Sequence, residues 1–420
     1  RYEHQPFVSC LAGLYGCQWR RYQRARVECG SFGLLILTFF LSFVFLYFWS
    51  EAQNDYYDFD WWVSHRTAII KLFIFKMHQD LLWTSFSCFS VRQVVVLALY
   101  LSVLFSLYLV PLGMYSPCIK EAGTLGPAPT LIGHRGAPML APENTLMSFE
   151  KAVESGGEGL ETDVTISYDG VPFLMHDSTL RRTTNVAQVF PNRTHLDAAM
   201  FTWAEIQQLN AGSWFLLRDP FGTASSLSEA DRSQAQNQSV PSLAQFLEVA
   251  AASGKLVLFD LRRPPYGHPY RLSYINTTLQ VIQAHINSSQ VLWLPSEDRA
   301  LVSGLDPALQ QTSGLKASIQ ELTDDGISRL NLHYSSMSQQ QICKYQSVNI
   351  STNLYVISQP WLYTLAWCAG AQSVTTNSVH ILSSINKPLF LMTPEEYTLM
   401  WILTDFVSAF LIFAIFTFHW

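Results

Sequence analysis

The chain has 420 residues, of which 49% are hydrophobic, 14% aromatic and 14% charged, and its formal net charge is −6. The length exceeds one ordinary domain, and the apolar fraction exceeds that of most soluble proteins, which argues against a wholly soluble single-domain chain. We expect part of the chain to lie in a lipid bilayer, and we expect no nucleic-acid partner.

Three apolar stretches predict transmembrane helices. Residues 32–49 contain no charge over eighteen positions, which is enough to cross a hydrocarbon core of about 30 Å as a helix. Residues 93–112 form a second uncharged stretch, and residues 398–420 form a third, interrupted only by Asp405. Residues 68–90 are a poor candidate for a span, because Lys71, Lys76, His78 and Asp80 lie within them.

The charges beside these stretches predict the topology, since cytoplasmic loops near a span are enriched in Lys and Arg. Arg20, Arg21, Arg24 and Arg26 lie shortly before residue 32, so residues 1–31 are expected to be a cytoplasmic segment. Residues 113–396 are then an extracellular or luminal domain of an integral plasma-membrane protein with both termini in the cytoplasm. Two outward crossings require a return crossing between them. Either residues 68–90 cross, or further spans are absent from this chain, whose first residue is Arg rather than Met.

Glycosylation sequons and cysteines bear on the same topology. All sequons lie in the middle of the chain, which favours a glycosylated extracellular or luminal domain; they are Asn192, Asn237, Asn276, Asn287 and Asn349. In an oxidising compartment, Cys118, Cys343 and Cys368 would give one disulfide and one remaining thiol, with the pairing open. Three cysteines near the first span are either palmitate acceptors or plain juxtamembrane residues; they are Cys10, Cys17 and Cys29.

From about residue 127, short apolar runs alternate with segments of helical period, which is typical of repeated βα units. Helices are expected at 144–155 and 242–253, the second with Ser242 as its N-cap. Roughly 250 residues with about eight strands fit an α/β (β/α)₈ barrel. Residues 190–240 are too long for a βα loop and are expected to form an insertion. The expected strands are 130–133, 159–165, 171–175, 255–261, 290–294, 328–333, 352–358 and 372–376.

Polar residues gather at the ends of four expected strands, and in a barrel the C-terminal ends of the strands converge on one site. Alternation along a strand places residues i and i+2 on one face. The residues concerned are His134 and Arg135 on the first strand, Glu161 and Asp163 on the second, His176 and Asp177 on the third, and Asp260 and Arg262 on the fourth.

These residue types together indicate phosphodiester cleavage. The carboxylates Glu161, Asp163 and Asp260 would repel one another unless a cation binds them, and oxygen ligands suit Mg²⁺ or Ca²⁺. Two histidines, His134 and His176, can serve as general acid and base near neutral pH. The guanidinium groups of Arg135 and Arg262 suit a phosphate. Taken singly, a strand-end histidine often caps a loop, and a Glu-x-Asp pair often forms salt bridges on a solvated face.

Residues 131–184 closely resemble the glycerophosphodiester phosphodiesterase family, and weaker similarity extends over roughly 127–385. The matching motifs are HRG at 134–136, PENT at 142–145, E-x-D at 161–163, DG-x-P at 169–172, HD at 176–177 and RTT at 182–184. The resemblance implies a TIM barrel that cleaves glycerophosphodiesters with a divalent cation. By motif, Glu161 and Asp163 would be metal ligands, His134 and His176 the acid/base pair, and Arg135 a phosphate ligand.

The flanking spans resemble those of the multi-spanning vertebrate subgroup of this family, which has six spans and an outward-facing catalytic domain. One difference lies on the fourth strand, where most members have Glu-x-Lys and this chain has Asp260 and Arg262. The related spider-venom phospholipases D also use Asp there. The difference leaves the metal and the substrate open.

Three functional hypotheses follow. The first is a membrane-anchored ecto-phosphodiesterase acting on glycerophosphoinositol or glycerophosphocholine. The second keeps the site but takes a membrane-bound substrate, such as a GPI anchor or a lysophospholipid. The third is an inactive receptor-like protein on an enzyme scaffold, against which the intact acids and histidines argue. Oligomeric state is not predicted.

Overall fold

The structure is a computed structural model that describes residues 40, 98, 102, 109 and 116–419. The predicted cytoplasmic segment 1–31 and the cysteines at 10, 17 and 29 lie outside the described residues. The same holds for nearly all of the stretches 32–49, 68–90 and 93–112.

Eight parallel strands close into a barrel, which confirms the predicted (β/α)₈ TIM barrel. The sheet has nine strands in the order β1-β9-β8-β7-β6-β5-β4-β2-β3, and β1 also pairs with β2, so the ring closes without β3. The parallel strands are β1 (Thr130–Gly133), β2 (Gly159–Ile166), β4 (Leu256–Leu261), β5 (Val291–Trp293), β6 (Gln310–Ser313), β7 (Arg329–His333), β8 (Ser351–Tyr355) and β9 (Ser373–Thr376).

A helix follows each barrel strand before the next one begins, which keeps all the strands parallel. The two helices predicted from sequence are α5 and α10, and both begin at a side-chain cap. Thr145 accepts a hydrogen bond from the Ser148 amide, and Ser242 caps α10 as predicted, in a capping box with Gln245. The helices are α5 (Leu146–Glu154), α10 (Leu243–Ser253), α11 (Tyr274–His285), α12 (Arg299–Leu305), α13 (Ile319–Asp324), α14 (Gln339–Gln346), α15 (Pro360–Ala369) and α16 (Val379–Leu382).

The largest hydrophobic core lies between the strands and these helices. Alternate residues of a strand face opposite sides, so Leu160 and Val164 of β2 pack outward while Glu161 and Asp163 face the interior. Phe259 of β4 packs into the same core, with its ring centroid 5.8 Å from that of Trp293. At the mouth of the barrel, the side chains of β2 that face the interior are therefore the polar ones.

The predicted strands differ from the structure in two places. A strand does form within 171–175, as β3 (Pro172–Leu174), but it is not a barrel strand, because it pairs antiparallel with the C-terminal end of β2. The barrel strand that completes the set of eight is β6, at 310–313. It was not predicted, because its sequence, QQTS, is polar. Antiparallel pairing has a functional consequence, since β3 runs back along β2 toward the mouth and delivers His176 there.

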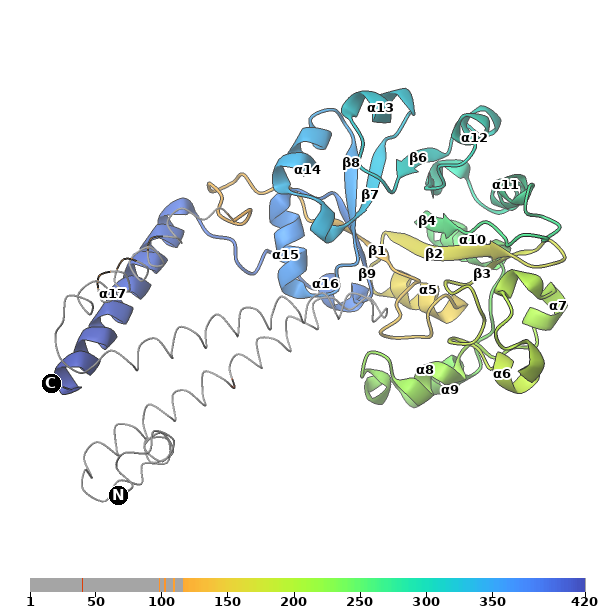
Figure 1. Ribbon diagram of the computed structural model, residues 1–420, viewed down its shortest axis with the longest axis horizontal. Coiled ribbons are helices and arrows are strands. Elements are labelled where there is room, and N and C mark those ends of the chain that lie inside the picture. The colour runs from red at the N-terminus through yellow and green to blue at the C-terminus, as the bar shows by residue number, and fades with distance from the viewer. Residues whose placement is uncertain (1–39, 41–97, 99–101, 103–108, 110–115, 420) are drawn as a thin grey trace, which may run out of the picture. The chain divides into compact units, whose positions relative to one another are not determined.

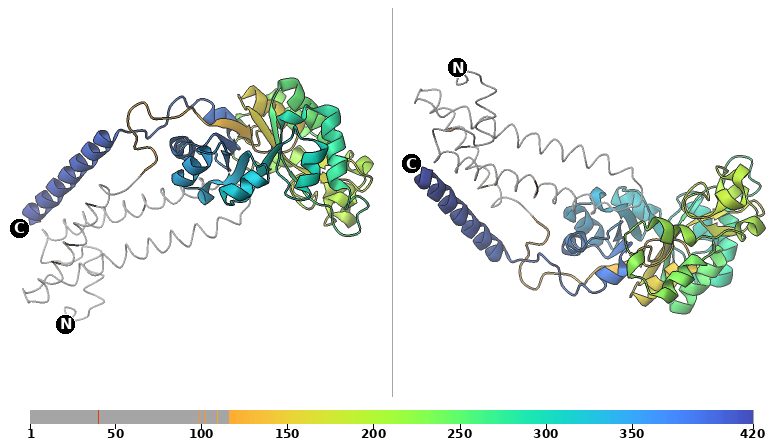
Figure 2. Two further views of the ribbon diagram at one scale, coloured as in Figure 1. Left: turned by 90° about the horizontal axis from the view of Figure 1, so that it is seen from above. Right: turned by 90° about the horizontal axis from the view of Figure 1, so that it is seen from below.

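Between β3 and α10 the chain forms a group of short helices, drawn in green in Figure 1 and still grouped in both views of Figure 2. They are α6 (Val186–Val189), η1 (Pro191–Arg193), η2 (Ala198–Met200), α7 (Trp203–Ile206), α8 (Ser213–Arg218), η3 (Ala224–Ser226) and α9 (Glu229–Gln236). This group has a hydrophobic core of its own, which includes Phe173, Leu180 and Phe201. The predicted insertion, 190–240, falls within it.

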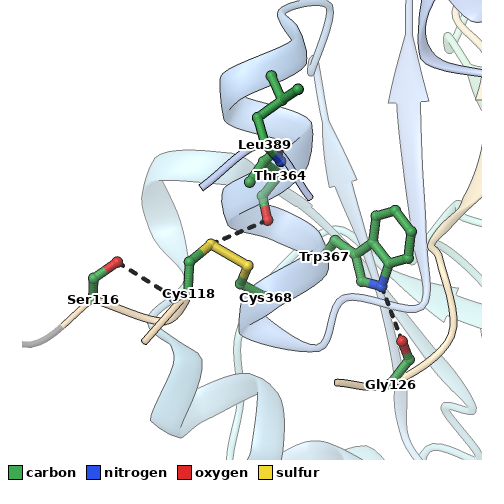
Figure 3. The surroundings of a disulfide bond; sticks show 7 residues. All are labelled: Ser116, Cys118, Gly126, Thr364, Trp367, Cys368 and Leu389. Carbon is green, nitrogen blue, oxygen red and sulfur yellow. Dashed lines mark hydrogen bonds between the residues drawn. A yellow bond between two sulfur atoms is a disulfide. The ribbon is translucent and has the colours of Figure 1, made fainter. Parts of the chain in front are cut away.

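The two ends of the barrel domain are joined to each other and to α15 (Figure 3). Cys118 forms a disulfide with Cys368 of α15, and Cys343 is the free, exposed thiol, in line with one disulfide and one remaining thiol. Ile119 bridges Met392 in parallel, and the Met392 amide donates to the Cys118 carbonyl at 3.1 Å. On the same helix, the Trp367 indole N–H donates to the Gly126 carbonyl. The Thr364 hydroxyl accepts a hydrogen bond from the Leu389 amide.

Residues 398–419 of the stretch predicted as the C-terminal span, 398–420, belong to one long helix, α17 (Pro394–His419). In the part of the chain that the structure describes, no helix combines the length and the apolar character needed to cross a membrane.

Candidate active site

The turn after β1 places two predicted site residues at the barrel mouth. Arg135 and Gly136 both have positive φ, 53° and 88°. At Gly136 a Cβ would come within 2.4 Å of the Ser148 hydroxyl, so only glycine fits. The Arg135 amide donates to Oε2 of Glu161 at 2.8 Å. This hydrogen bond helps to hold Arg135 in a conformation that non-glycine residues rarely adopt.

Strand register brings the three predicted carboxylates together. Asp163 of β2 lies opposite Asp260 of β4, and register partners in parallel strands share a face. Glu161 lies two residues before Asp163, on that same face. Asp163 is buried, Glu161 is partly buried, and Asp260 is exposed at the rim.

The crowding of these acids raises two pKa values. Burial raises the pKa of Glu161 well above its usual value, and the charge of Asp163 raises it further. The pKa of Asp260 is also raised, first by the protein that surrounds much of this carboxyl and then by Asp163. A nearby cation would stabilise the ionised forms of both groups.

His134 is oriented by a residue from the last barrel strand. Its Nδ1 lies 2.7 Å from Oδ1 of Asn377, which directly follows β9. The amide oxygen can only accept, so Nδ1 carries the proton in the neutral ring and Nε2 keeps the lone pair. Nε2 points into the mouth, 4.0 Å from Oε2 of Glu161.

His176 is oriented by a carboxylate instead. Its Nδ1 lies 3.1 Å from Oδ1 of Asp177, and its Nε2 lies 4.0 Å from Oδ1 of Asp163. Asp177 in turn accepts two hydrogen bonds of 2.8 Å from the guanidinium of Arg182. The two imidazoles therefore present their Nε2 atoms to carboxylates on the same strand, β2.

A buried charge network lies behind the site. Glu143 accepts hydrogen bonds of 2.7 and 2.6 Å from Arg182, and one of 3.2 Å from Arg135. Burial alone would raise the pKa of Glu143, but the two guanidinium groups outweigh it and lower the pKa to about 2. Glu143 thus holds the guanidinium groups of Arg135 and Arg182 in place. Nε of Arg135 also lies 3.6 Å from Oδ2 of Asp163.

Asn144, with φ of 54°, supports the second strand. Its Nδ2 donates to Oδ2 of Asp163 at 3.1 Å, and its Oδ1 accepts from the Thr162 hydroxyl at 2.7 Å. The PENT motif thereby ties the loop before α5 to β2 through two neighbouring residues, one of which is the acid Asp163.

Arg262 makes contacts different from those expected of a phosphate ligand. Its guanidinium donates to the carbonyl oxygen of His176 at 2.5 Å and to that of Met175 at 3.4 Å. In this arrangement Arg262 holds the backbone that carries His176. Its role toward phosphate stays a prediction.

Sequence reasoning thus placed His134, Arg135, Glu161, Asp163, His176, Asp260 and Arg262 at one mouth, where the structure brings them together. It assigned no role to Glu143, Asn144, Arg182 or Asn377. The first three lie within motifs that were recognised as family-like. Asn377 follows an expected strand, and the strand-end rule that selected His134 would have found it.

In the described part of the chain, no group of three or more His, Cys, Asp or Glu side chains is arranged as a set of metal ligands. The chemistry of the donors nevertheless fits a hard cation, since three carboxylates share one face and repel one another. Glu161 and Asp163 use Oε2 and Oδ2 for bonds to Arg135 and Asn144. Glu161, Asp163 and Asp260 are the residues that would hold such a cation, which would offset the repulsion among them.

All five sequon asparagines are exposed: Asn192, Asn237, Asn276, Asn287 and Asn349. Their modification stays a prediction.

Comparison with known proteins agrees with this geometry. Residues 134–266 match the glycerophosphoryl diester phosphodiesterase family. The human glycerophosphodiester phosphodiesterase domain-containing protein 5 is 42% identical over 99% of this chain and 84% of its own length. The mouse glycerophosphoinositol inositolphosphodiesterase is 37% identical over 98% of this chain and 93% of its own length.

Among solved structures, an Oleispira antarctica phosphodiesterase in complex with the product sn-glycerol-3-phosphate matches with a TM-score of 0.50 and 24% identity. The match covers 61% of this chain and 96% of that one, and it supports the same fold.

Proposed function

Because the chain belongs to the glycerophosphoryl diester phosphodiesterase family of enzymes, we propose that it hydrolyses glycerophosphodiesters of the glycerophosphoinositol or glycerophosphocholine type by acid/base catalysis between His134 and His176. The observation that carries this proposal is the pair of imidazoles at one mouth, each with Nδ1 bound to a protein acceptor and Nε2 turned toward the acids of β2. The name of the mouse relative, which specifies glycerophosphoinositol, supports the substrate class.

The partners of the two rings support a division of roles between them. A carboxylate stabilises a positive imidazolium through its charge, whereas a neutral amide does not. His176, bound to Asp177, is therefore the acid, and His134, bound to Asn377, is the base. His134 takes the proton of the substrate hydroxyl next to the phosphate, and the oxygen bonds to phosphorus. His176 protonates the leaving oxygen as its P–O bond breaks. Water then opens the cyclic ester with the roles reversed.

Charge on the phosphoryl oxygens requires positive groups in the mouth. Arg135, fixed by Glu143 and Asp163, offers one guanidinium there. Glu161, Asp163 and Asp260 would hold a divalent cation, Mg²⁺ or Ca²⁺. Such a cation supplies charge stabilisation for the phosphoryl oxygens when it is bound.

The proposal extends to location. An integral plasma-membrane protein with the barrel outside and both termini inside is supported by the arginines before residue 32 and by five exposed sequons. The Cys118–Cys368 disulfide adds support, since disulfides persist in oxidising compartments. Peptide-N-glycosidase should lower the apparent mass of the cell-expressed protein. An unchanged mass would count against an outside barrel.

The decisive experiment uses the purified full chain with glycerophosphoinositol and glycerophosphocholine, in Mg²⁺ or Ca²⁺, and follows the products by phosphorus NMR. We expect turnover, and we expect His134→Ala and His176→Ala each to lower kcat by about 10²–10⁴-fold. Arg193→Met, in the insertion, is the control. No turnover with any substrate would overturn the proposal.

A second experiment tests the attacking group. A substrate analogue without the hydroxyl next to the phosphate should bind yet resist cleavage. Cleavage at the normal rate would mean that water attacks phosphorus directly.

A further inference from the structure

A polar pocket lies beside the candidate active site and shares Asp177 and Arg182 with it. It has a volume of about 410 Å³ and is lined by Asp177, Thr179, Arg181, Arg182, His195 and Arg218. We call it the basic pocket, because three arginines and a histidine face one carboxylate. Its walls come from the loop after β3, from the segment between η1 and η2, and from the end of α8.

The carboxylate in this pocket does not balance its arginines. Asp177 already binds Arg182 through two hydrogen bonds, and Arg182 also binds Glu143. Arg181 and Arg218 are exposed, and neither forms a salt bridge with any residue that the structure describes. Two guanidinium charges in the basic pocket therefore lack a protein counter-charge within 4.0 Å in the described part of the chain.

The chemistry of this lining selects an anion. Guanidinium groups match the oxygens of a phosphate in pairs, and a cationic group such as choline would be repelled. A volume of about 410 Å³ is in the range of pockets that hold small molecules.

Position connects the basic pocket to catalysis. Asp177 lines the basic pocket and also binds His176. A ligand in the basic pocket would therefore contact the residue that orients the candidate acid. A diester held between the two histidines could therefore extend its head group toward Arg181 and Arg218.

We propose that the basic pocket binds a phosphate monoester on the head group of the substrate, so that phosphorylated glycerophosphoinositols are preferred to glycerophosphocholine. The substrate preference rests on the function proposed above, whereas phosphate binding by the pocket does not. The phosphate belongs either to a soluble substrate or to a phosphorylated lipid head group, and the two sources share one recognition chemistry.

The test measures binding and turnover separately, with the full chain and with Arg181→Ala, Arg218→Ala and the double variant. Calorimetry measures binding of inositol 1,4-bisphosphate, and flotation measures binding to phosphatidylcholine vesicles with and without phosphatidylinositol 4-phosphate. Arg232→Ala is the matched control. Arg232 is also an exposed arginine of the insertion, but it bonds to the Ser225 carbonyl and lies outside the pocket lining.

We expect each single substitution to weaken phosphate binding at least about tenfold, because one hydrogen bond between charged groups is worth that much. Arg232→Ala should bind as the wild type does. If the pocket variants lose binding to the soluble bisphosphate, the result supports a soluble substrate. If they lose binding to the vesicles alone, it supports a lipid head group. The proposal is overturned if the wild type binds neither probe, or if the pocket variants bind both probes as well as the wild type does. It is also overturned if Arg232→Ala weakens binding as much as the pocket substitutions do.

Turnover of glycerophosphoinositol is measured on the same wild-type preparation. If the wild type binds the bisphosphate through Arg181 and Arg218 but cleaves nothing, the proposed function fails and the pocket stands. If it cleaves the diester while the substitutions leave binding unchanged, the pocket fails and the function stands.

Discussion

Arg182→Met should destabilise the barrel domain in a way that depends on pH. Arg182 joins two acids, Glu143 and Asp177, through four hydrogen bonds of 2.6–2.8 Å, and only 4% of the Glu143 side chain is exposed. Removing one partner of a buried ion pair leaves the other charge without compensation. The substitution keeps an unbranched side chain of similar length, so the loss is mainly one of charge.

The magnitude follows from the pKa of Glu143. A fall from the usual 4.5 to about 2 is worth about 3 kcal/mol of stability at neutral pH. Arg135 supplies part of this, but breaking buried pairs costs about 3–5 kcal/mol in other proteins, so about 3 kcal/mol is expected for the variant. For a domain of this size, the loss corresponds to a fall of roughly 6–12 °C in Tm.

The sign of the pH dependence can be worked out. The pKa of Glu143 is lower in the folded chain than in the unfolded one, so its ionised form stabilises the fold fully above about pH 4.5. This contribution is lost as the pH falls from 4.5 toward 2. The gap in Tm between wild type and Arg182→Met should therefore be widest near pH 7 and should narrow below pH 4.5.

The assay is thermal unfolding of the purified full chain from pH 7 to pH 3. Arg193→Met is the control, since Arg193 and Glu205 form a pair whose side chains are 34% and 27% exposed and which should contribute about 1 kcal/mol or less. Equal Tm for wild type and Arg182→Met at pH 7, or a gap of constant width down to pH 3, would refute the reasoning.

Three further predictions concern the site and the fold. Asn377→Ala should lower kcat about tenfold with little change in KM, because one orienting hydrogen bond is lost; an unchanged pH–rate profile would argue against an orienting role. Excess EDTA should abolish turnover, and Mg²⁺ or Ca²⁺ should restore it; full activity in EDTA would exclude the carboxylate-bound cation. Replacing Cys118 and Cys368 with serine should cost about 2–5 kcal/mol, since the bond closes a loop of 250 residues. An unchanged Tm in the double variant would contradict this.

Most of the fold could be predicted from local pattern, and the errors have physical causes. Strand β6 reads QQTS, and its polar residues Gln311 and Thr312 are buried, so no apolar run marks it. The pattern at 171–175 indicated a strand but not its direction. Only five residues separate β2 from β3, too few for a parallel crossover, so loop length would have predicted the antiparallel pair.

Part of the site depends on tertiary partners that spacing does not reveal. Strand ends and i, i+2 spacing found the histidines and the carboxylates. The bond between Arg182 and Glu143 joins residues 39 positions apart, and no local rule pairs them. The contact of Arg262 with the His176 carbonyl depends likewise on the path of β3, which was assigned wrongly.

The disulfide to α15 also determines how a pulling force would travel through the domain. A pulling force applied at residue 116 is transmitted covalently from Cys118 to Cys368, because the disulfide joins residues that are 250 positions apart in the sequence. His134, Glu161, Asp163, His176 and Asp260 all lie inside this bypassed loop, away from the covalent path between the two ends. Asn377 lies outside the loop, on the stretch that leads from Cys368 to α17. Of the residues that make up the catalytic centre, Asn377, the partner of His134, is therefore the one that lies on the covalent path between the two ends.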